Sequence, residues 1–129
     1  MGTLKVNKPG FLTTLQDLGR IGYQEFGMPV AGAMDPFSLQ IANKLVGNEP
    51  GEGALEITMM GPELEFIGEA LIAITGADLS PVINGRQVPM WQSFLVKTGD
   101  ILTFKGLKKG CRSYVAVAGG FDVPLIMGS

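Results

Sequence analysis

The sequence predicts a mainly β protein with one α-helix, folded as a barrel or another closed β structure. Short apolar or alternating runs recur along the chain between Gly, Pro and Asn residues, which is the pattern of strands and turns. Only the segment at about 36–46 combines helical spacing with start and stop residues. Many short strands with regular turn signals are typical of closed β architectures. We therefore expect one compact β unit over residues 1–129.

The N-terminal segment is expected to begin with two strands. Thr3 to Val6 precedes the turn pair Pro9-Gly10, and Phe11 to Leu15 follows it. Gly and Pro together mark a turn because Pro fixes one backbone angle and Gly tolerates conformations that other residues resist. The two runs therefore predict a strand, a turn and a second strand.

The helix is predicted from its capping residues and its apolar spacing. Asp35 is a typical N-cap, and Pro36 is tolerated at the first helical position. The apolar residues Phe37, Ile41 and Leu45 follow at intervals of four, with Ala42 and Val46 beside them, and together they form one apolar stripe. Gly47 stands where a left-handed cap is expected after the last turn.

The rest of the chain is expected to be strands. Asn84-Gly85 is a strong hairpin signal between Pro81–Ile83 and Arg86–Val88, because both positions of that turn need a positive φ. Thr98-Gly99-Asp100 is a further turn that leads into a strand. The predicted strands are Ala54–Met59, Glu63–Ile67, Leu71–Ile74, Val82–Ile83, Phe94–Val96, Ile101–Phe104 and Ser113–Val117.

Composition excludes several classes of protein. Hydrophobic residues make up 46% and charged residues 17% of 129 residues, which argues against disorder. The net charge of -2 and the absence of a basic run argue against nucleic-acid binding, and no apolar run approaches a membrane span of about 18 residues. Cys111 is the only cysteine, so an internal disulfide is excluded and a reducing, cytoplasmic location is expected. There is no histidine, so neither a Ser-His-Asp nor a Cys-His site can be built from this chain alone.

Candidate catalytic residues come from a glycine-punctuated polar segment, Pro9 to Asn48, and from the strand that follows it. Arg20 has the fork geometry that binds a carboxylate or phosphate, although a surface ion pair with Asp17 is the alternative. Asp35 is a candidate whose other role is the helix cap. Glu56 alternates with apolar neighbours and either serves chemistry or faces solvent.

Candidate substrate-binding residues lie in the same segment and in two similar strand-turn segments. Residues 71–85 and 114–128 align at an interval of 43, which places two glycine turns in corresponding positions. The alternatives are two turns that present backbone N–H groups to one cleft, or convergence on a common strand-turn pattern. The candidates are Tyr23, Asn43, Gly76, Asp78, Gly119 and Gly120. Arg112 and Tyr114 flank Ser113 on the last long strand, where exposed strand positions are the commoner explanation.

Several long ordered motifs resemble those of one enzyme family. They are PGFLTTLQDLGRIGYQEFGMPVAGAMDPFSLQIANKLVGN, ALEITMMGPELEF, IAITGADL and GCRSYVAVAGGFDVPLIMGS. The chain resembles the N-terminal part of the C subunit of 5-oxoprolinase. This family is also called allophanate hydrolase subunit 2 and is similar to the carboxyltransferase domain of urea amidolyase.

This resemblance implies a cyclophilin-like β-barrel and a cytoplasmic subunit of an ATP-dependent enzyme that opens 5-oxoproline to glutamate. It implies a B-type partner subunit, a third 5-oxoprolinase subunit, and a small carboxylate or amide substrate. No biotin attachment site and no metal cluster is visible in the sequence. Two alternatives remain open, which are a urea or amide carboxyltransferase-like subunit and a non-catalytic antagonist of a sporulation-kinase inhibitor.

The sequence departs from the family pattern at two places. Ala31 stands where the family has a small hydroxyl residue before GAMD, and the chain stops at Ser129, earlier than the family's chains. We expect a truncated first region of a longer two-part subunit. Its open strand edges would favour pairing, so a homodimer is expected as one outcome.

Overall fold

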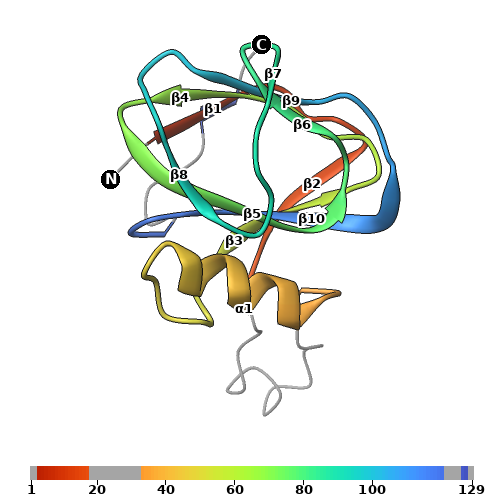
Figure 1. Ribbon diagram of the computed structural model, residues 1–129, viewed down its shortest axis with the longest axis vertical. Coiled ribbons are helices and arrows are strands. Elements are labelled where there is room, and N and C mark those ends of the chain that lie inside the picture. Colours follow the sequence, from red (N-terminus) through yellow and green to blue (C-terminus); the bar gives the residue numbers. More distant parts are fainter. Residues whose placement is uncertain (1–2, 18–32, 121–125, 128–129) are drawn as a thin grey trace.

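The computed structural model describes residues 3–17, 33–120 and 126–127 and consists mainly of strands (Figure 1). Arg20 and Tyr23 lie outside the described residues. In chain order the elements are β1 (Thr3–Lys8), β2 (Leu12–Gln16), α1 (Pro36–Leu45), β3 (Ala54–Thr58), β4 (Glu63–Ile67), β5 (Ala70–Asp78), β6 (Pro81–Ile83), β7 (Arg86–Gln87), β8 (Ser93–Val96), β9 (Ile101–Phe104), β10 (Lys109–Val117) and β11 (Ile126–Met127). The predicted mainly β class with one helix is confirmed.

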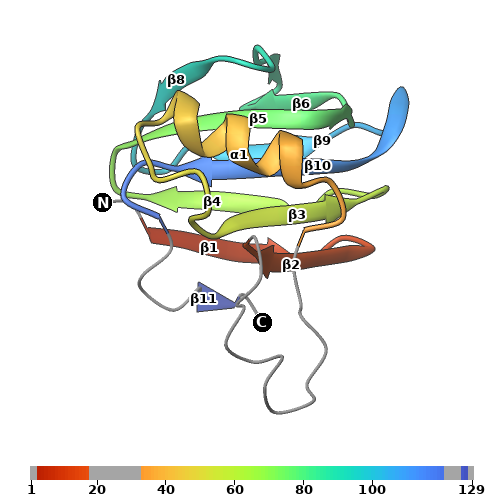
Figure 2. The ribbon, with the colours of Figure 1, turned by 90° about the horizontal axis from the view of Figure 1, so that it is seen from below.

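The strands form two sheets that face each other (Figures 1 and 2). One sheet has the order β11-β1-β4-β9-β6-β7, and the other has the order β2-β3-β10-β5-β8. Neighbouring strands are antiparallel, except that β1 and β11 are parallel. Residues far apart in the sequence therefore meet within one sheet, as those of β3 and β10 do.

The core lies between the two sheets and follows from strand alternation. Every second residue of a strand points to the same face, so Leu64 and Phe66 of β4 point inward, as do Ile72 and Ile74 of β5. These side chains are buried almost completely. The loss of apolar surface from water is the main term that holds the sheets together.

The helix packs on the outer face of the five-stranded sheet (Figure 2). Leu39 and Ala42 of α1 are buried against small side chains of the sheet, among them Ala73 and Ala116. Alanines on the sheet allow the helix to approach closely. A buried hydrogen bond of 2.7 Å from the Thr75 hydroxyl to the Ser38 carbonyl oxygen fixes the helix on β5.

The predicted helix is confirmed, but only part of its predicted apolar stripe is buried. Phe37 is 66% exposed, and Ile41 and Leu45 are only partly buried. Ala42 and Val46 of that stripe are buried, and they share the buried face with Ser38, Leu39 and Asn43. Apolar spacing does not predict this face, because Ser38 and Asn43 have hydrogen-bond partners in the folded chain. These partners offset the free-energy cost of burying their polar groups.

The hairpin at Asn84-Gly85 is confirmed. Both residues have positive φ, 51° and 82°, and Ile83 pairs with Arg86 across the turn. The predicted turn at Gly76 was wrong, because β5 continues through this residue to Asp78. Among the described residues, no helix is long and apolar enough to cross a lipid bilayer.

Candidate functional site

A cleft of about 820 Å³ opens at the start of α1. Its walls come from four places in the chain, namely the helix start, the end of β5 with the start of β6, the end of β7 with its connection to β8, and the start of β10. The lining residues are Met34, Asp35, Ser38, Gly76, Ala77, Asp78, Ser80, Pro81, Gln87, Val88, Met90, Trp91, Lys108, Lys109, Gly110, Cys111 and Arg112. Two predicted candidates with ionisable side chains, Asp35 and Asp78, therefore share one cleft.

The charges of the cleft are divided between its walls. Lys108, Lys109 and Arg112 come from the segment that enters β10, whereas the carboxylates are those of Asp35 and Asp78. Three cations close together attract an anion, and two carboxylates can accept hydrogen bonds from an amide. The cleft can therefore bind a small molecule that carries both groups.

A bulge between β5 and β10 shapes one wall of the cleft. Lys109 pairs with Asp78, and Ser113 pairs with Gly76. Between these two pairs β10 therefore contains more residues than β5. At Gly76 φ is +84°, and a Cβ there would lie 2.5 Å from the Arg112 carbonyl oxygen. Because a bulge re-aims the side chains around it, it turns the start of β10 toward the cleft.

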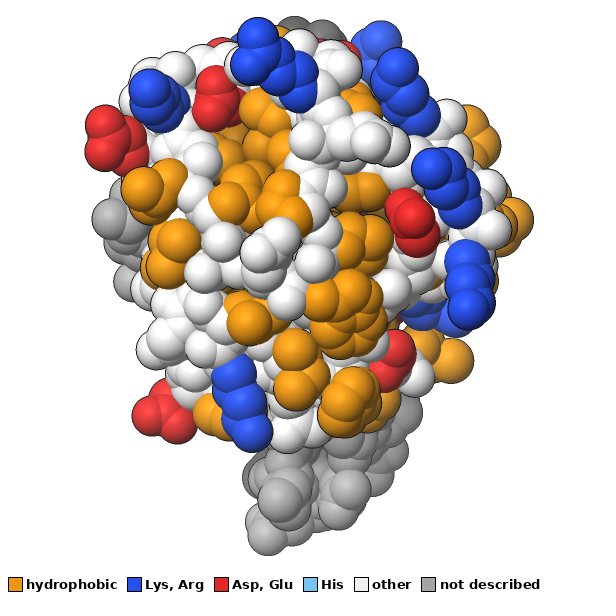
Figure 3. Space-filling model, in the orientation of Figure 1, with side chains coloured by type: hydrophobic (Ala, Val, Ile, Leu, Met, Phe, Trp, Pro, Cys, Tyr) orange, Lys and Arg blue, Asp and Glu red, His pale blue; other side chains and the backbone are white. Residues whose placement is uncertain are grey.

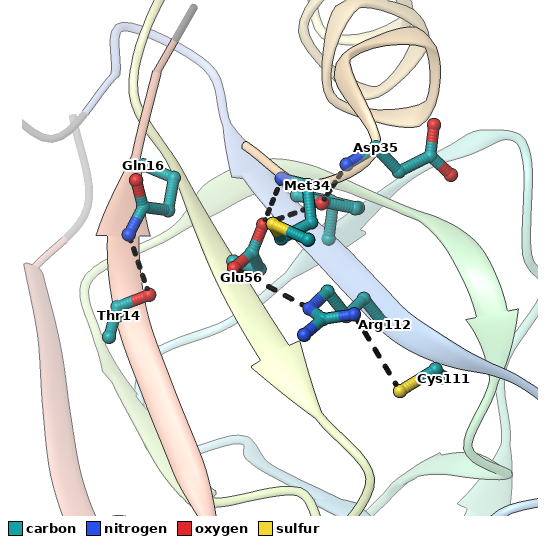
Figure 4. A network of polar contacts seen from close by, with 8 residues as sticks. Thr14, Gln16, Met34, Asp35, Glu56, Cys111 and Arg112 are labelled. Atoms are coloured by element: carbon teal, nitrogen blue, oxygen red, sulfur yellow. Dashed lines mark hydrogen bonds and ion pairs between the residues drawn. The ribbon is translucent and has the colours of Figure 1, made fainter. Parts of the chain in front are cut away.

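Glu56 is buried beside the cleft and connects three segments of the chain (Figure 4). Its Oε2 accepts hydrogen bonds from the Tyr114 hydroxyl at 2.6 Å and from the Met34 backbone N–H at 2.9 Å. Its Oε1 lies 4.0 Å from Nε of Arg112. Glu56 is only 6% exposed, so the solvent-facing alternative was wrong. Met34, just before α1, reaches Glu56 from another part of the chain, which the sequence did not indicate.

Tyr114 completes this buried network. Its side chain is fully buried, and its oxygen accepts a hydrogen bond of 2.9 Å from the Asp35 backbone N–H while it donates to Glu56. Burial, and next the hydrogen bond to Glu56, raise the pKa of Tyr114 well above its usual value. The phenol is therefore neutral at physiological pH and serves as a fixed hydrogen-bond donor.

Asp35 caps the helix and lines the cleft at the same time. Its Oδ1 accepts from the Ser38 backbone N–H at 3.1 Å, and its Oδ2 accepts from the Ser38 hydroxyl at 2.6 Å. The predicted N-cap is confirmed. These two hydrogen bonds from Ser38 fix the orientation of the carboxylate. Asp35 is therefore a fixed acceptor.

Arg112 presents its guanidinium at the edge of the cleft (Figure 4). Its side chain is 32% exposed, and Nη1 donates to the Cys111 sulfur at 3.8 Å. In the part of the chain that the structure describes, its carboxylate partner is Glu56, held by a long contact of 4.0 Å. A guanidinium so weakly paired retains donors for a ligand.

The remaining predicted residues lie elsewhere. Asn43 is buried and donates to the Pro50 and Glu52 carbonyl oxygens, and it also accepts from Asn48. Asn48 in turn accepts from the Gly119 backbone N–H at 2.8 Å. These contacts order the connection after α1.

The two glycine turns do not share a cleft. Gly76 pairs with Ser113, and Gly119 lies six residues further along, beyond the far end of β10. The strand from Ser113 to Val117 alone spans about 13 Å, and neither Gly119 nor Gly120 lines the cleft beside Gly76. Gly119 and Gly120 therefore cannot join Gly76 around one small molecule, and the shared-cleft interpretation was wrong.

Several cleft residues were not among the sequence-predicted candidates. Trp91, Lys108 and Lys109 line the cleft, as does Arg112, for which the sequence favoured an exposed strand position. The signal that was available is the KKGCR run at 108–112, where three cations flank a glycine just before a strand. In the described part of the chain, no group of three or more acidic or Cys side chains gathers to hold a metal ion.

The structure is a mainly β domain with a cleft at the start of its helix, and the comparisons with known proteins identify its family. The family model described as carboxyltransferase domain, subdomain A and B, matches residues 26–129. The chain belongs to this family. The predicted resemblance is therefore confirmed.

Related proteins carry two kinds of name. The chain is 43% identical to the C subunit of Escherichia coli 5-oxoprolinase over 98% of its own length and 41% of that protein. It is 39% identical to urea amidolyase of Saccharomyces cerevisiae over 98% of its length and 7% of that protein. The crystal structure of K. lactis urea amidolyase superposes with a TM-score of 0.88 at 43% identity, over 94% of this chain and 7% of that one. The chain thus spans less than half of each of these relatives.

Proposed function

We propose that this chain forms the N-terminal part of a subunit of an ATP-dependent 5-oxoprolinase, which hydrolyses 5-oxoproline to glutamate. The similarity to the E. coli protein carries this proposal. It extends over nearly the whole of this chain, and it covers a larger share of that protein than of the urea amidolyase relatives described above. The C subunit of 5-oxoprolinase from Haemophilus influenzae is also similar, at 34% identity over 90% of the chain.

The chemistry of the cleft supports this substrate class. 5-Oxoproline is a small ring with a carboxylate and a cyclic amide. Arg112 and Lys109 offer charge-assisted hydrogen bonds to the carboxylate, and Asp78 and Asp35 offer acceptors to the amide N–H. In this proposal Arg112 binds substrate, while Glu56 and Tyr114 hold the wall around it. Arg20 and Tyr23, which lie outside the described residues, stay candidate site residues from the sequence alone.

The ATP-dependent step is assigned to the assembly. The sequence has no histidine and no Walker loop, so the groups that handle ATP come from a B-type partner and from a third 5-oxoprolinase subunit. We place the assembly in the cytoplasm, since the single cysteine is free and exposed. The chain by itself is expected to be inactive.

The test is turnover by the assembled enzyme with an Arg112 variant. Arg112→Ala should raise KM for 5-oxoproline by roughly 10- to 100-fold, because a hydrogen bond to a charged group contributes about 1.5–3 kcal/mol. Arg86→Ala is the matched control, since Arg86 is exposed on β7 and does not line this cleft. If the wild-type assembly released no glutamate from 5-oxoproline and ATP, the proposed function would be wrong.

A second candidate function is a carboxyltransferase-like subunit that acts on urea or another amide. The family description and the urea amidolyase relatives support it. The same assembly would then consume ATP with bicarbonate and urea, and not with 5-oxoproline. None of the relatives described above bears a name that favours an antagonist of a sporulation-kinase inhibitor.

A further inference from the structure

Positive backbone φ angles recur around the cleft. Four of its lining residues have positive φ, namely Gly76 at +84°, Ser80 at +57°, Trp91 at +62° and Gly110 at +85°. Glycine adopts such angles freely, whereas a bulky residue like tryptophan does so only under constraint. Strain of this kind persists where the surrounding structure imposes it, which is common at ligand sites.

Trp91 is the most unusual of these residues. A backbone hydrogen bond of 2.8 Å from its N–H to the Ile74 carbonyl oxygen fixes it against β5, in the connection between β7 and β8. Its side chain is 44% exposed although it lines the cleft. Core packing does not explain a strained tryptophan that leaves nearly half of its surface in water. A fully buried side chain would remove more apolar surface from water and so stabilise the fold more.

The walls of the cleft differ in character around Trp91. Val88 and Met90 lie near it in the chain and add apolar surface, whereas the lysines and Arg112 come from the entry to β10. In Figure 3 hydrophobic side chains gather over the middle of the visible face, and Lys and Arg side chains stand at its rim. A ligand with one flat face and one anionic group matches this division.

We propose that Trp91 is a specificity-determining residue that stacks its indole on the planar amide of the ligand while the ligand's carboxylate faces Arg112. This inference rests on the proposed function and adds recognition of the flat face of the amide, whereas the charged residues are proposed to bind its N–H and the carboxylate. The strained backbone and its hydrogen bond to β5 fix the position from which the indole meets the ligand. The class of ligand is a planar cyclic amide or ureido group that carries a carboxylate.

The test measures binding of three probes by titration calorimetry and by quenching of Trp91 fluorescence, since Trp91 is the only tryptophan of the chain. 5-Oxoproline has the flat amide and the carboxylate, proline lacks the amide plane, and 2-pyrrolidone lacks the carboxylate. We expect 5-oxoproline to bind tightest and to quench the fluorescence. Trp91→Leu should weaken its binding about five- to tenfold, and Trp91→Phe should weaken it less.

Stability measurements separate this role from a structural one. Trp91→Gly should be more stable than Trp91→Ala, because only glycine adopts the positive φ without strain. This is the reverse of the usual order of these two substitutions. Both variants should bind 5-oxoproline equally poorly. Met59 is the matched control, with φ of 61°, an exposed side chain and no place in the cleft. Met59→Gly should exceed Met59→Ala in stability, and both should bind like the wild type.

The outcomes distinguish this inference from the proposed function. Unchanged 5-oxoproline binding in Trp91→Leu, equal binding of proline and 5-oxoproline, or no binding of any probe would overturn the stacking role. Trp91-dependent binding without turnover in the assembled enzyme would instead overturn the proposed function and leave the stacking role in place.

Discussion

The Tyr114 hydroxyl offers the sharpest test of the buried network. Tyr114→Phe keeps the ring and its packing but removes one oxygen, which donates to Glu56 at 2.6 Å and accepts from the Asp35 N–H at 2.9 Å. The change therefore weakens the solvation of a buried carboxylate and leaves a backbone N–H without its partner. Both effects act between β3, β10 and the start of α1.

The expected loss follows from the two broken contacts. A hydrogen bond to a charged group contributes about 1.5–3 kcal/mol, and a buried donor left without an acceptor costs about 1–3 kcal/mol. We expect a loss of about 3 kcal/mol in the free energy of unfolding, near the lower end of the combined range, since the Met34 N–H still donates to Glu56. Such a loss is a large part of the stability of an ordinary domain.

The assay is urea unfolding of the wild type, Tyr114→Phe and a control, with the free energy taken from the midpoint and slope. The control is Thr58→Val, because the Thr58 hydroxyl is buried and makes no hydrogen bond in the structure. Removal of an unpaired hydroxyl should leave stability unchanged or raise it by about 1 kcal/mol. The reasoning fails if Tyr114→Phe costs less than Thr58→Val, or if both cost the same.

Three further predictions concern pH, the helix face and the bulge. The folded state raises the pKa of Tyr114 above its ordinary value of 10.0, so the unfolded chain loses this proton at a lower pH than the folded chain does. The free energy of unfolding should therefore fall as pH rises above about 10. The urea midpoint of Tyr114→Phe should fall less steeply with pH than that of the wild type. Leu39→Ala should cost about 3 kcal/mol, whereas Phe37→Ala should stay within about 0.5 kcal/mol because Phe37 is exposed; equal losses in thermal unfolding would contradict the buried face described above. Gly76→Ala should cost about 3 kcal/mol, since its Cβ would meet the Arg112 carbonyl oxygen at 2.5 Å and its φ is positive; a variant with the wild-type unfolding midpoint would refute the steric argument.

Local signals predicted the elements of this fold well. Asp35 and Pro36 start the helix, and Asn84-Gly85 turns the hairpin, as the sequence indicated. Each of these features depends on the backbone preferences of one or two residues, which act over a single turn of chain. They can therefore be read without knowledge of the rest of the molecule.

The buried polar residues could not be predicted in the same way. Asn43 and Glu56 can be buried because residues from other segments form hydrogen bonds with their polar groups. Periodicity counts apolar residues, so it placed Phe37 in the core and left Glu56 facing solvent as an open alternative. Whether a polar side chain is buried depends on partners that only the tertiary structure brings together.

The sequence alone determined most of the strands, the helix, the hairpin turn at Asn84-Gly85 and the family resemblance, because these depend on local preferences and on the order of residues. The tertiary structure decided the membership of the cleft. It joined Asp35, Asp78, Trp91 and Arg112 from four separate segments and placed Gly119 at the other end of the sheet. The physical reason is the register of β5 and β10, since the bulge at Gly76 and the covering helix set which side chains meet.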